Sequence, residues 1–342
     1  MKNALKMIPG LTRLVRIFRR NKRTFYPFQA HVAGLDFFSD VYVDWTAYPV
    51  LKNQLHPMFQ ILGSYFAFTK NFTEDRKKRL RKQAFNIMSR LSKLVVWNET
   101  LKIAVPPYRI CLHFRDPRCY KVVSELLNKP NRIKKFLNKD DTFIDVGANH
   151  GSYSIIAGKL VGPRGLVVAI EPNPRLARLV ETSLALNDCA NFQVHQMACG
   201  NRNAIVDFFI PEFNSGEAGI YSNFSATYDH SKIRASLRRF DQHFNWQNFP
   251  GKIFMKVDVE GSEYEFLLGA KEMIITRRPG ILLEVNPWSL KCAKTTAEDL
   301  IILLKKLGYT HFMDVDNPTK QISLENLNAT YHQNIVMFPS GM

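Results

Sequence analysis

The sequence predicts an α/β protein built on a doubly wound, mostly parallel sheet that follows a basic, largely helical region. Segments typical of strands and helices alternate from about residue 101 onward, which is the pattern of a sheet with helices on both faces. The 342 residues are 46% hydrophobic, enough for a packed core. Residues 1–140 hold 28 Lys and Arg against 9 Asp and Glu, whereas residues 141–342 hold 19 against 21. We therefore expect two parts, residues 1–100 and 101–342.

The first part of the chain is basic and amphipathic. Within residues 11–20, apolar side chains follow helical spacing and arginines occupy the positions between them. A second amphipathic helix is expected over residues 73–94. Such segments bind anionic membrane surfaces, so we expect a cytoplasmic protein with peripheral membrane contact. The absence of acidic residues before Asp36 also fits a mitochondrial transit peptide, and a basic tail is the simplest alternative. No apolar stretch reaches the roughly 20 residues that cross a bilayer.

The second part of the chain contains the segments expected to form the sheet. Residues 102–105 and 109–114 predict two short strands around the turn Pro106-Pro107. Further strands are expected over residues 142–146, 166–170, 192–195, 204–210, 253–257, 281–285, 310–315 and 334–338, and helices over residues 152–160, 174–186, 263–275 and 297–307. The last two strands can pair as a hairpin. Ligands of such sheets bind beyond the carboxyl ends of the strands, so those ends are the first candidates for chemistry.

A glycine-bearing loop follows the strand expected over residues 142–146. Its spaced residues are Asp145, Gly147, Asn149 and Gly151, and a helix follows, so a ligand can approach backbone N–H groups there. Glu171 ends the next strand, where a carboxylate can accept both hydroxyls of a ribose. The loop lacks the Gly-x-Gly-x-x-Gly cradle of a dinucleotide site, and an acid ahead of it suits an ammonium group. The pattern therefore predicts S-adenosyl-L-methionine as the cofactor.

Charged residues follow two later strands. Period-two geometry puts Lys256, Asp258 and Glu260 on one side if the chain stays extended, and Glu284 ends the neighbouring strand. A central parallel strand should be apolar on both faces, so these charges indicate a site where the sheet opens. Its carboxylates can orient or deprotonate a hydroxyl, and Asp258 is the first candidate for this role, with Glu284 second.

Two alternatives to this assignment remain open. His150, His230 and His243 are other candidates for a general base, although a single histidine is more often a surface or core residue. Three acids at adjacent strand ends can also hold Mg²⁺, but no ligand spacing demands a metal and none is predicted.

Four stretches, in this order, carry a family resemblance: FIDVGANHGSYS, AIEPNP, KVDVEGSEYEFLLGA and ILLEVNP. They resemble the FkbM-type S-adenosylmethionine-dependent methyltransferases, over about residues 101–342. The resemblance implies a seven-stranded, Rossmann-like methyltransferase fold. It also implies cofactor contacts at the spaced loop residues and at Glu171, and a role after the central strand for Asp258, Glu260 and Gly261. Asp241 matches the last residue of a Thr-Leu-Asp segment of the family.

We therefore expect an O-methyltransferase that acts on a hydroxyl of a sugar, glycan, polyketide or other small metabolite. An RNA methyltransferase is the main alternative, because the same cofactor loop would serve it and the basic region would contact phosphates. A glycosyltransferase would instead use Asp314 and Asp316 as a metal-binding pair. The segment Val105-Pro106-Pro107-Tyr108 resembles an amino-methylating motif but lacks its amide or carboxylate. A membrane-associated adaptor without enzymatic activity would not explain the charged residues at the strand ends.

Overall fold

The chain divides into two compact units, residues 1–97 and 98–342. The structure, a computed structural model, describes residues 42–43, 100–113, 116, 118, 122, 125–126, 130–211, 215–221, 230–317, 321–322 and 333–340. The first unit contributes the described strand β1 (Tyr42–Val43), and the amphipathic segments predicted over residues 11–20 and 73–94 lie outside the described residues. None of the described helices is long and apolar enough to cross a membrane.

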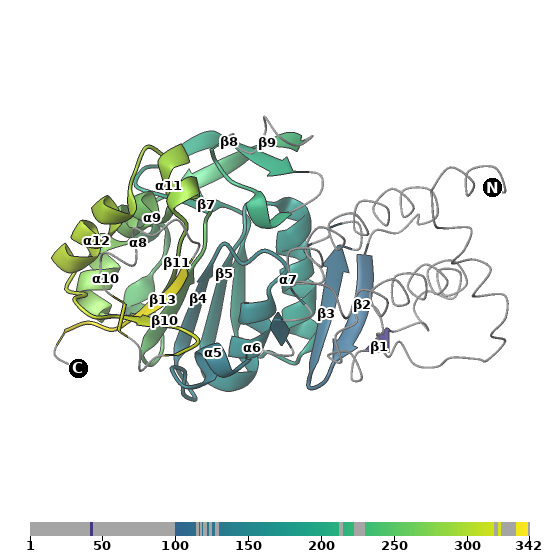
Figure 1. The fold of residues 1–342 in the computed structure, drawn as a ribbon. Coiled ribbons are helices and arrows are strands. Elements are labelled where there is room, and N and C mark those ends of the chain that lie inside the picture. The colour runs from purple at the N-terminus through teal and green to yellow at the C-terminus, as the bar shows by residue number, and fades with distance from the viewer. Residues whose placement is uncertain are drawn as a thin grey trace, which may run out of the picture. The chain divides into compact units, whose positions relative to one another are not determined.

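A seven-stranded sheet forms the centre of the second unit (Figure 1). Its strand order is β12-β13-β11-β10-β4-β5-β6. These strands are β4 (Thr142–Val146), β5 (Leu166–Ile170), β6 (Phe192–His195), β10 (Ile253–Val257), β11 (Gly280–Val285), β12 (Phe312–Asp314) and β13 (Gln333–Met337). Neighbours are parallel, except that β13 runs antiparallel to β11 and to β12. The order reverses between β4 and β10, which is where such sheets bind ligands. The predicted doubly wound, mostly parallel sheet is confirmed.

Helices cover both faces of this sheet (Figure 1). One side carries α5 (Pro130–Lys134), α6 (Ser152–Val161) and α7 (Pro174–Leu186), and the other carries α8 (Phe240–His243), α9 (Glu263–Gly269), α10 (Lys271–Arg277) and α12 (Ala297–Lys306). The short helix α11 (Pro287–Cys292) follows β11. Local sequence sets the helix starts: Asn173 and Asn286 cap α7 and α11, and Thr296 and Asp299 form a capping box on α12.

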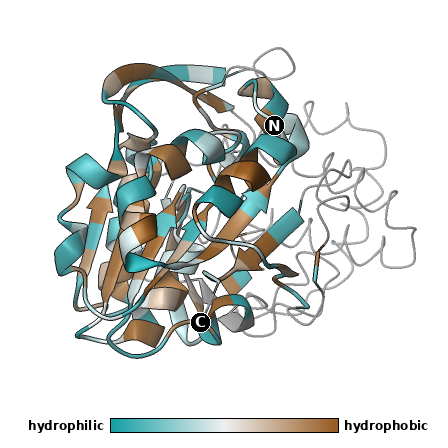
Figure 2. Cartoon of the chain, turned by 90° about the vertical axis from the view of Figure 1, so that its left-hand side faces the viewer, coloured by the Kyte–Doolittle hydropathy of each residue, from teal (hydrophilic) through white to brown (hydrophobic). Residues whose placement is uncertain are grey.

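The core lies between the sheet and these helices. Every residue of β4, β5, β10 and β11 is buried, and Figure 2 shows hydrophobic residues along the strands with hydrophilic residues on the outward faces of the helices. Charged exceptions to this apolar interior are Asp145, Lys256 and Glu284, each in the carboxyl-terminal half of its strand. Because a buried charge is costly unless it is paired, these three residues mark the end of the sheet where chemistry is expected.

A second, three-stranded sheet differs from the prediction. The segment predicted as a strand over residues 204–210 forms β8 (Ala204–Pro211), but β8 pairs antiparallel with β9 (His230–Arg238) outside the main sheet. The short strand β7 (Ala198–Cys199) runs parallel to β9 on its other side. The alternation of Ile233, Ala235 and Leu237 marks β9, but the exposed basic residues between them hide it in a search for apolar runs.

The helix predicted over residues 263–275 is also different, because it breaks at Ala270 into α9 and α10. Asp241, which the family resemblance had singled out, accepts hydrogen bonds from the backbone N–H groups of Glu272 (2.8 Å) and Met273 (3.0 Å). Its carboxylate therefore caps α10 from another segment, a contact that local helical periodicity does not reveal.

The hairpin predicted ahead of the main sheet forms from β2 (Thr100–Val105) and β3 (Tyr108–His113). It docks on α7 through two long-range hydrogen bonds, from Cys111 N to Ser183 Oγ and from Arg109 N to Asn187 Oδ1, both 2.9 Å. The segment Val105-Pro106-Pro107-Tyr108 is the turn of this hairpin and does not line the pocket described below. Its role in the described structure is to connect the two strands.

Candidate active site

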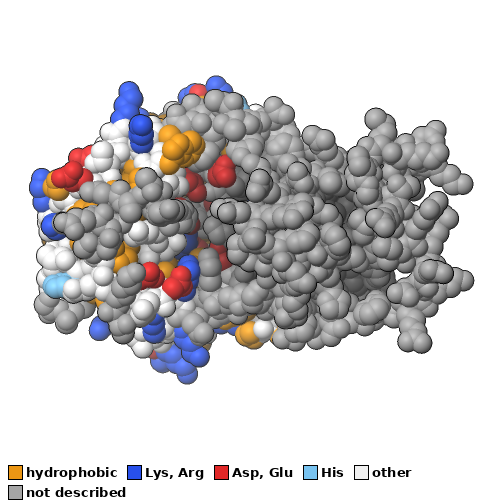
Figure 3. Space-filling view, viewed as in Figure 1, with side chains coloured by type: hydrophobic (Ala, Val, Ile, Leu, Met, Phe, Trp, Pro, Cys, Tyr) orange, Lys and Arg blue, Asp and Glu red, His pale blue; other side chains and the backbone are white. Residues whose placement is uncertain are grey.

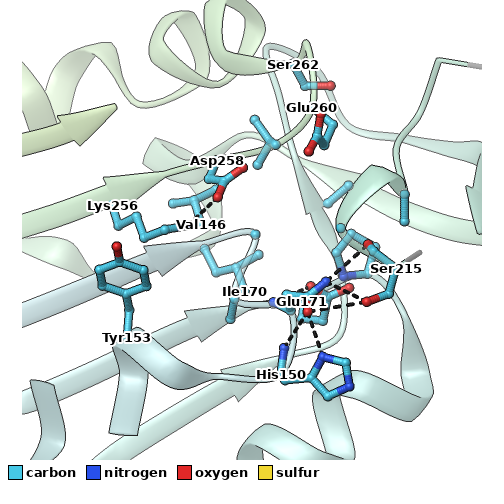
Figure 4. A pocket seen from close by; sticks show the side chains of 18 of the residues that line it. Val146, His150, Tyr153, Ile170, Glu171, Ser215, Lys256, Asp258, Glu260 and Ser262 are labelled. Carbon is cyan, nitrogen blue, oxygen red and sulfur yellow. Dashed lines mark hydrogen bonds and ion pairs between the residues drawn. The ribbon is translucent and has the colours of Figure 1, made fainter. Parts of the chain in front are cut away.

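A pocket of about 780 Å³, counted with its open mouth, lies beyond the carboxyl ends of β4, β5 and β10. Its walls come from the loop after β4, the ends of β5 and β10, β7, β8 and residues 215–220 (Figure 4). Acidic side chains gather in a recess on the face of the molecule shown in Figure 3. The pocket is lined by apolar side chains, among them Ile170, Met197, Phe208 and Ile220, and by charged ones.

The glycine loop owes its shape to left-handed backbone conformations at Gly147, Asn149 and Gly151. Gly147 has φ of 80°, and a Cβ atom on it would lie 2.0 Å from the carbonyl oxygen of Asp258. Gly151 has φ of 81° and lies against Val180 of α7, where a Cβ atom would be 3.0 Å away. The loop thus packs directly against the segment after β10 and against α7, and a side chain at either glycine would collide with these neighbours.

Asn149 holds the loop to a segment that the sequence did not single out. Its side-chain amide donates to the carbonyl oxygen (3.1 Å) and hydroxyl (3.0 Å) of Ser215, in the 3₁₀ turn Ser215–Glu217. Its backbone N–H donates to Glu171 Oε2 at 2.8 Å. Ser215 N in turn donates to Asp116 Oδ1 at 3.3 Å. Asn149 therefore joins three segments that surround the pocket, and Ser215 had no motif that would have identified it.

Glu171 is buried at the end of β5 and lines the pocket. Its other oxygen, Oε1, accepts from Asn173 N at 2.9 Å, so both oxygens already hold one backbone donor. Burial nevertheless raises the pKa of Glu171 to about 7. Each carboxylate oxygen has a further lone pair, which leaves acceptor sites for the two hydroxyls of a ribose.

We predict that Glu171→Gln weakens cofactor binding by about 1.5–3 kcal/mol, because a neutral amide replaces an ionised acceptor. The wild-type affinity should also rise as pH increases through about 7, since hydroxyl donors favour the ionised form of a carboxyl whose pKa is about 7. Calorimetric titration of the cofactor between pH 6 and pH 8 measures both effects. A variant with the same affinity and the same pH profile as the wild type would place the ribose elsewhere.

Lys256 is a buried cation of the pocket wall that contacts Asp258 and Tyr153. Its ammonium group donates to Asp258 Oδ2 at 2.9 Å and lies 5.2 Å from the centre of the Tyr153 ring (Figure 4). Asp258 and Asp145 raise its pKa even though burial opposes this. Asp145 accepts from Ser154 Oγ at 2.6 Å and does not line the pocket, so its negative charge acts from behind the pocket wall rather than by direct contact.

Three carboxyl groups meet near Lys256, and two of them, those of Asp258 and Glu260, line the pocket. One oxygen each of Asp258, Glu260 and Glu284 lies within 4.8 Å of the others. The chain does not stay extended there, because Glu260 has φ of 49°, yet its carboxylate still reaches the group and accepts from Ser289 Oγ at 3.1 Å. At this spacing, repulsion must be offset by nearby cations or by retained protons.

The pKa values of Asp258 and Glu260 shift in opposite directions. Although burial acts in the opposite direction, Lys256 and a hydrogen bond from Glu284 lower the pKa of Asp258. Burial and the neighbouring carboxylates raise the pKa of Glu260 well above its usual value. Asp258 is therefore ionised at neutral pH and faces the pocket, which suits a group that orients or accepts a proton from a hydroxyl.

Arg118 is a charged neighbour of this cluster that the sequence had not identified. It lines the pocket, and the charges of Glu125, Asp258 and Glu284 raise its pKa against the effect of burial. Its guanidinium lies 3.9 Å from Glu125 Oε1. Together with Lys256, it supplies the positive charge that keeps the cluster from being wholly negative.

Glu263 shapes the loop that carries Asp258 and Glu260. It is buried, and its carboxyl oxygens accept from the backbone N–H groups of Val259 (3.0 Å) and Gly261 (3.0 Å). Its place in the motif was visible in the sequence, but its structural role depends on a turn that motif spacing does not specify.

We predict that Glu263→Gln lowers the free energy of unfolding by about 1–3 kcal/mol, because the amide cannot accept both backbone hydrogen bonds through two carboxyl oxygens. Turnover should fall as well, since the loop that places Asp258 loosens. Urea denaturation of this variant, with Glu272→Gln on the exposed surface of α10 as the matched control, measures the stability change. Equal stability of the two variants would contradict the role given to Glu263.

Other sequence candidates lie apart from the acid cluster. His150 is buried in the pocket wall, and burial lowers its pKa to about 4, while its Nδ1 contacts Asn149 Oδ1 at 2.7 Å. His230 begins β9 at the surface, and His243 ends α8. Asp314 and Asp316 do not line the pocket: Asp316 pairs with Arg132, and Asp314 accepts from Asp316 N at 2.8 Å. The metal-binding role considered for this pair is therefore not supported.

Known proteins resemble this chain in part. A model of the methyltransferase FkbM domain matches residues 145–310. A curated relative, the mitochondrial rRNA methyltransferase 2 of Schizosaccharomyces pombe, is 44% identical over 59 residues, which are 17% of this chain and 25% of that protein. A solved structure of methyltransferase FkbM from Methylobacillus flagellatus KT is 15% identical with a TM-score of 0.37, and covers 65% of this chain and 54% of its own. TYW2 of M. jannaschii, solved in complex with AdoMet, is 12% identical with a TM-score of 0.39. The match covers 72% of this chain and 88% of the TYW2 chain. The chain thus spans a quarter of the curated relative and about half of the first structure.

The strand order, the glycine loop and the buried acid after β5 define an S-adenosylmethionine-dependent methyltransferase domain. The residues fit this cofactor, because the glycine loop and Glu171 line the same pocket and Glu171 offers acceptors for its ribose. Residues 145–310 match the methyltransferase FkbM domain.

Proposed function

We propose that this protein transfers the methyl group of S-adenosylmethionine to a hydroxyl of a small, uncharged metabolite such as a sugar, glycan or polyketide. The observation that supports this best is the ionised Asp258, paired with Lys256 and facing the same pocket as the glycine loop and Glu171. An ionised carboxylate at that place can position a hydroxyl by accepting its hydrogen bond, and the lowered pKa of Asp258 favours this orienting role over uptake of the proton.

The chemistry requires mostly positioning. S-adenosylmethionine, when bound, supplies a methyl group on a positively charged sulfur. The loop after β4 and Glu171 would hold the cofactor, and the Asp258 side chain would orient the acceptor oxygen. In-line displacement gains most of its rate from such alignment, and a general base adds a smaller factor of about 10²–10⁴. Glu260 and Glu284 would stabilise the proton that leaves the acceptor.

Charge at the acceptor end favours a neutral acceptor. Asp258, Glu260 and Glu284 lie together there, with Glu263 buried beside them. Lys256 is paired with Asp258 and Arg118 lies beside Glu125, so little unpaired positive charge is left there to hold a phosphate. A hydroxyl-rich acceptor, in contrast, can donate hydrogen bonds to these oxygens.

A panel of ligands and acceptors tests this proposal. S-adenosylmethionine at 100 times its dissociation constant should stabilise the protein by about 2.7 kcal/mol, which a thermal shift detects, whereas NAD and a nucleotide sugar should give no shift. Transfer of labelled methyl groups to pooled glycans or polyhydroxylated metabolites, and not to RNA, is then expected. Stabilisation by the nucleotide sugar alone would contradict the assignment of S-adenosylmethionine as the cofactor. Labelled RNA would contradict the assignment of a small metabolite as the acceptor.

RNA methylation is the second candidate function. The partial match to an rRNA methyltransferase favours it, as does the positive charge of residues 1–140. This candidate requires the full-length protein to bind RNA with a steep dependence on salt, because each neutralised phosphate releases counterions. The labelling experiment above separates it from the first proposal.

We also propose that residues 11–20 attach the protein peripherally to an anionic membrane. Four arginines in this segment would meet lipid phosphates, each contributing about 1 kcal/mol near the surface. Removal of residues 1–23 should abolish sedimentation with vesicles containing phosphatidylserine, while cofactor binding remains. Sedimentation that survives the truncation would argue against this anchor.

A further inference from the structure

Two histidines outside the pocket face each other on the surface of the second unit. His195 is the last residue of β6, and His243 is the last residue of α8. Nδ1 of His195 lies 3.4 Å from Nε2 of His243, and the two ring planes meet at 85°. Neither side chain lines the pocket, so the proposed methyl transfer does not account for their arrangement.

The separation of the two nitrogens suits a shared metal ion. It is long for an N–H···N hydrogen bond, which is commonly about 2.9–3.2 Å. Two imidazole nitrogens bound tetrahedrally to Zn²⁺, each about 2.0–2.1 Å from the ion, lie about 3.4 Å apart. The rings therefore already have the spacing that chelation requires.

Neighbouring residues hold both rings in place. Gln193 Oε1 lies 3.3 Å from Nε2 of His195 and can accept its hydrogen, which leaves the lone pair of Nδ1 directed toward His243. Partners of this kind fix the tautomer of histidines that bind metals. The ring of Phe244 meets both imidazoles edge-on, with centroids 4.6 Å from His195 and 4.8 Å from His243. Little ordering of side chains would be needed on binding.

The protonation state of His195 and His243 also suits metal binding. Burial lowers the pKa of His195, and the neighbouring His243 lowers it further. Burial and the positive charge of Arg238 lower the pKa of His243. Both imidazoles are therefore neutral at pH 7, the form that binds metals. Arg238 also weakens the attraction for a cation, so the site should be of moderate affinity.

We propose that His195 and His243 form a binding site for a borderline transition-metal ion such as Zn²⁺, Ni²⁺ or Cu²⁺. Imidazole is a preferred ligand of these ions, and no third His, Cys, Asp or Glu joins the pair within the described residues, so water fills the remaining positions. The bound ion would connect α8 to β6. The carbonyl oxygen of His195 accepts from Glu171 N and Met197 N, both at 3.0 Å, so the site lies directly behind the cofactor end of the pocket.

Titration of the full-length, untagged protein with ZnCl₂ and with CuCl₂ tests the proposal independently of methyl transfer. We expect saturable binding that His243→Ala weakens by more than about tenfold and Gln193→Leu weakens by less than about tenfold, below the typical 10–100-fold cost of losing a ligand's partner, because this contact is long and exposed. His311→Ala, which removes an exposed histidine elsewhere, is the matched control and should bind as the wild type does.

Spectroscopy provides a second measurement that does not depend on folding stability. The electron paramagnetic resonance spectrum of the Cu²⁺-loaded wild type should show two coordinating nitrogens, and that of folded His243→Ala should show at most one from this site. Zinc affinity that is equal in His243→Ala and His311→Ala, or a wild-type copper spectrum without a second nitrogen, would overturn the proposal.

Discussion

Replacement of Asp258 by Asn is expected to reduce methyl transfer by roughly two to four orders of magnitude, because the side chain keeps its size but loses the charge that orients and deprotonates the acceptor. Asp258 is ionised in the wild type, since Lys256 donates to it at 2.9 Å and lowers its pKa. Cofactor affinity should change much less, because the proposed cofactor contacts are made by the glycine loop and Glu171 and not by the Asp258 side chain. Single-turnover kinetics and calorimetry measure the two effects separately.

The matched control for this variant is Asp207→Asn. Asp207 is a carboxylate on β8 that pairs with Lys232 and Arg234 at the surface and does not line the pocket. It should leave turnover unchanged. Near-wild-type turnover of Asp258→Asn would show that Asp258 is simply an acid at a strand end, and an equal fall in turnover and affinity would assign it to the cofactor.

Local sequence patterns were sufficient for the main sheet. Strands β4, β5 and β10 are short apolar runs bounded by loop residues, and their buried positions follow directly from that pattern. Strand β9 was missed because exposed basic residues alternate with its apolar ones, and pairing with β8 is what stabilises it. The break between α9 and α10 depends on Asp241, which is more than twenty residues away in the chain, so periodicity within the helix could not predict it.

Motif spacing located the residues of the site but not the contacts between them. Asp145 was expected to meet an ammonium group of the ligand, yet it lies behind the pocket wall and its charge faces Lys256. Arg118 and Ser215 belong to segments without a recognisable pattern, and they reach the pocket only through tertiary packing. Such contacts join residues far apart in sequence, which is the part of a site that spacing along one chain does not encode.

Replacement of Lys256 by Met should lower the free energy of unfolding by about 3–5 kcal/mol, the typical cost of removing one partner of a buried ion pair. Lys256 is 6% exposed and is the positive charge closest to Asp258, with Asp145 also acting on it. Methionine has similar length and is apolar, so the loss arises from charge rather than from a cavity. Urea denaturation at pH 7.5 measures it.

The same variant has a distinctive pH dependence. In the wild type, Lys256 lowers the pKa of Asp258, so this pair contributes stability above the unfolded pKa of about 3.9, and loses it as pH falls through the lower folded value. In Lys256→Met, burial is no longer opposed by the lysine, so the pKa of Asp258 rises, and that of Asp145, which burial already raises in the wild type, rises further; the variant therefore recovers as these carboxyls protonate. The stability difference between the two proteins should therefore narrow from pH 7.5 to pH 5.

In a Lys256→Met variant that also carries Asp258→Asn, part of the loss at pH 7.5 should be restored. A difference that is independent of pH, with no restoration, would mean that Lys256 stabilises the fold through packing and not through its charge.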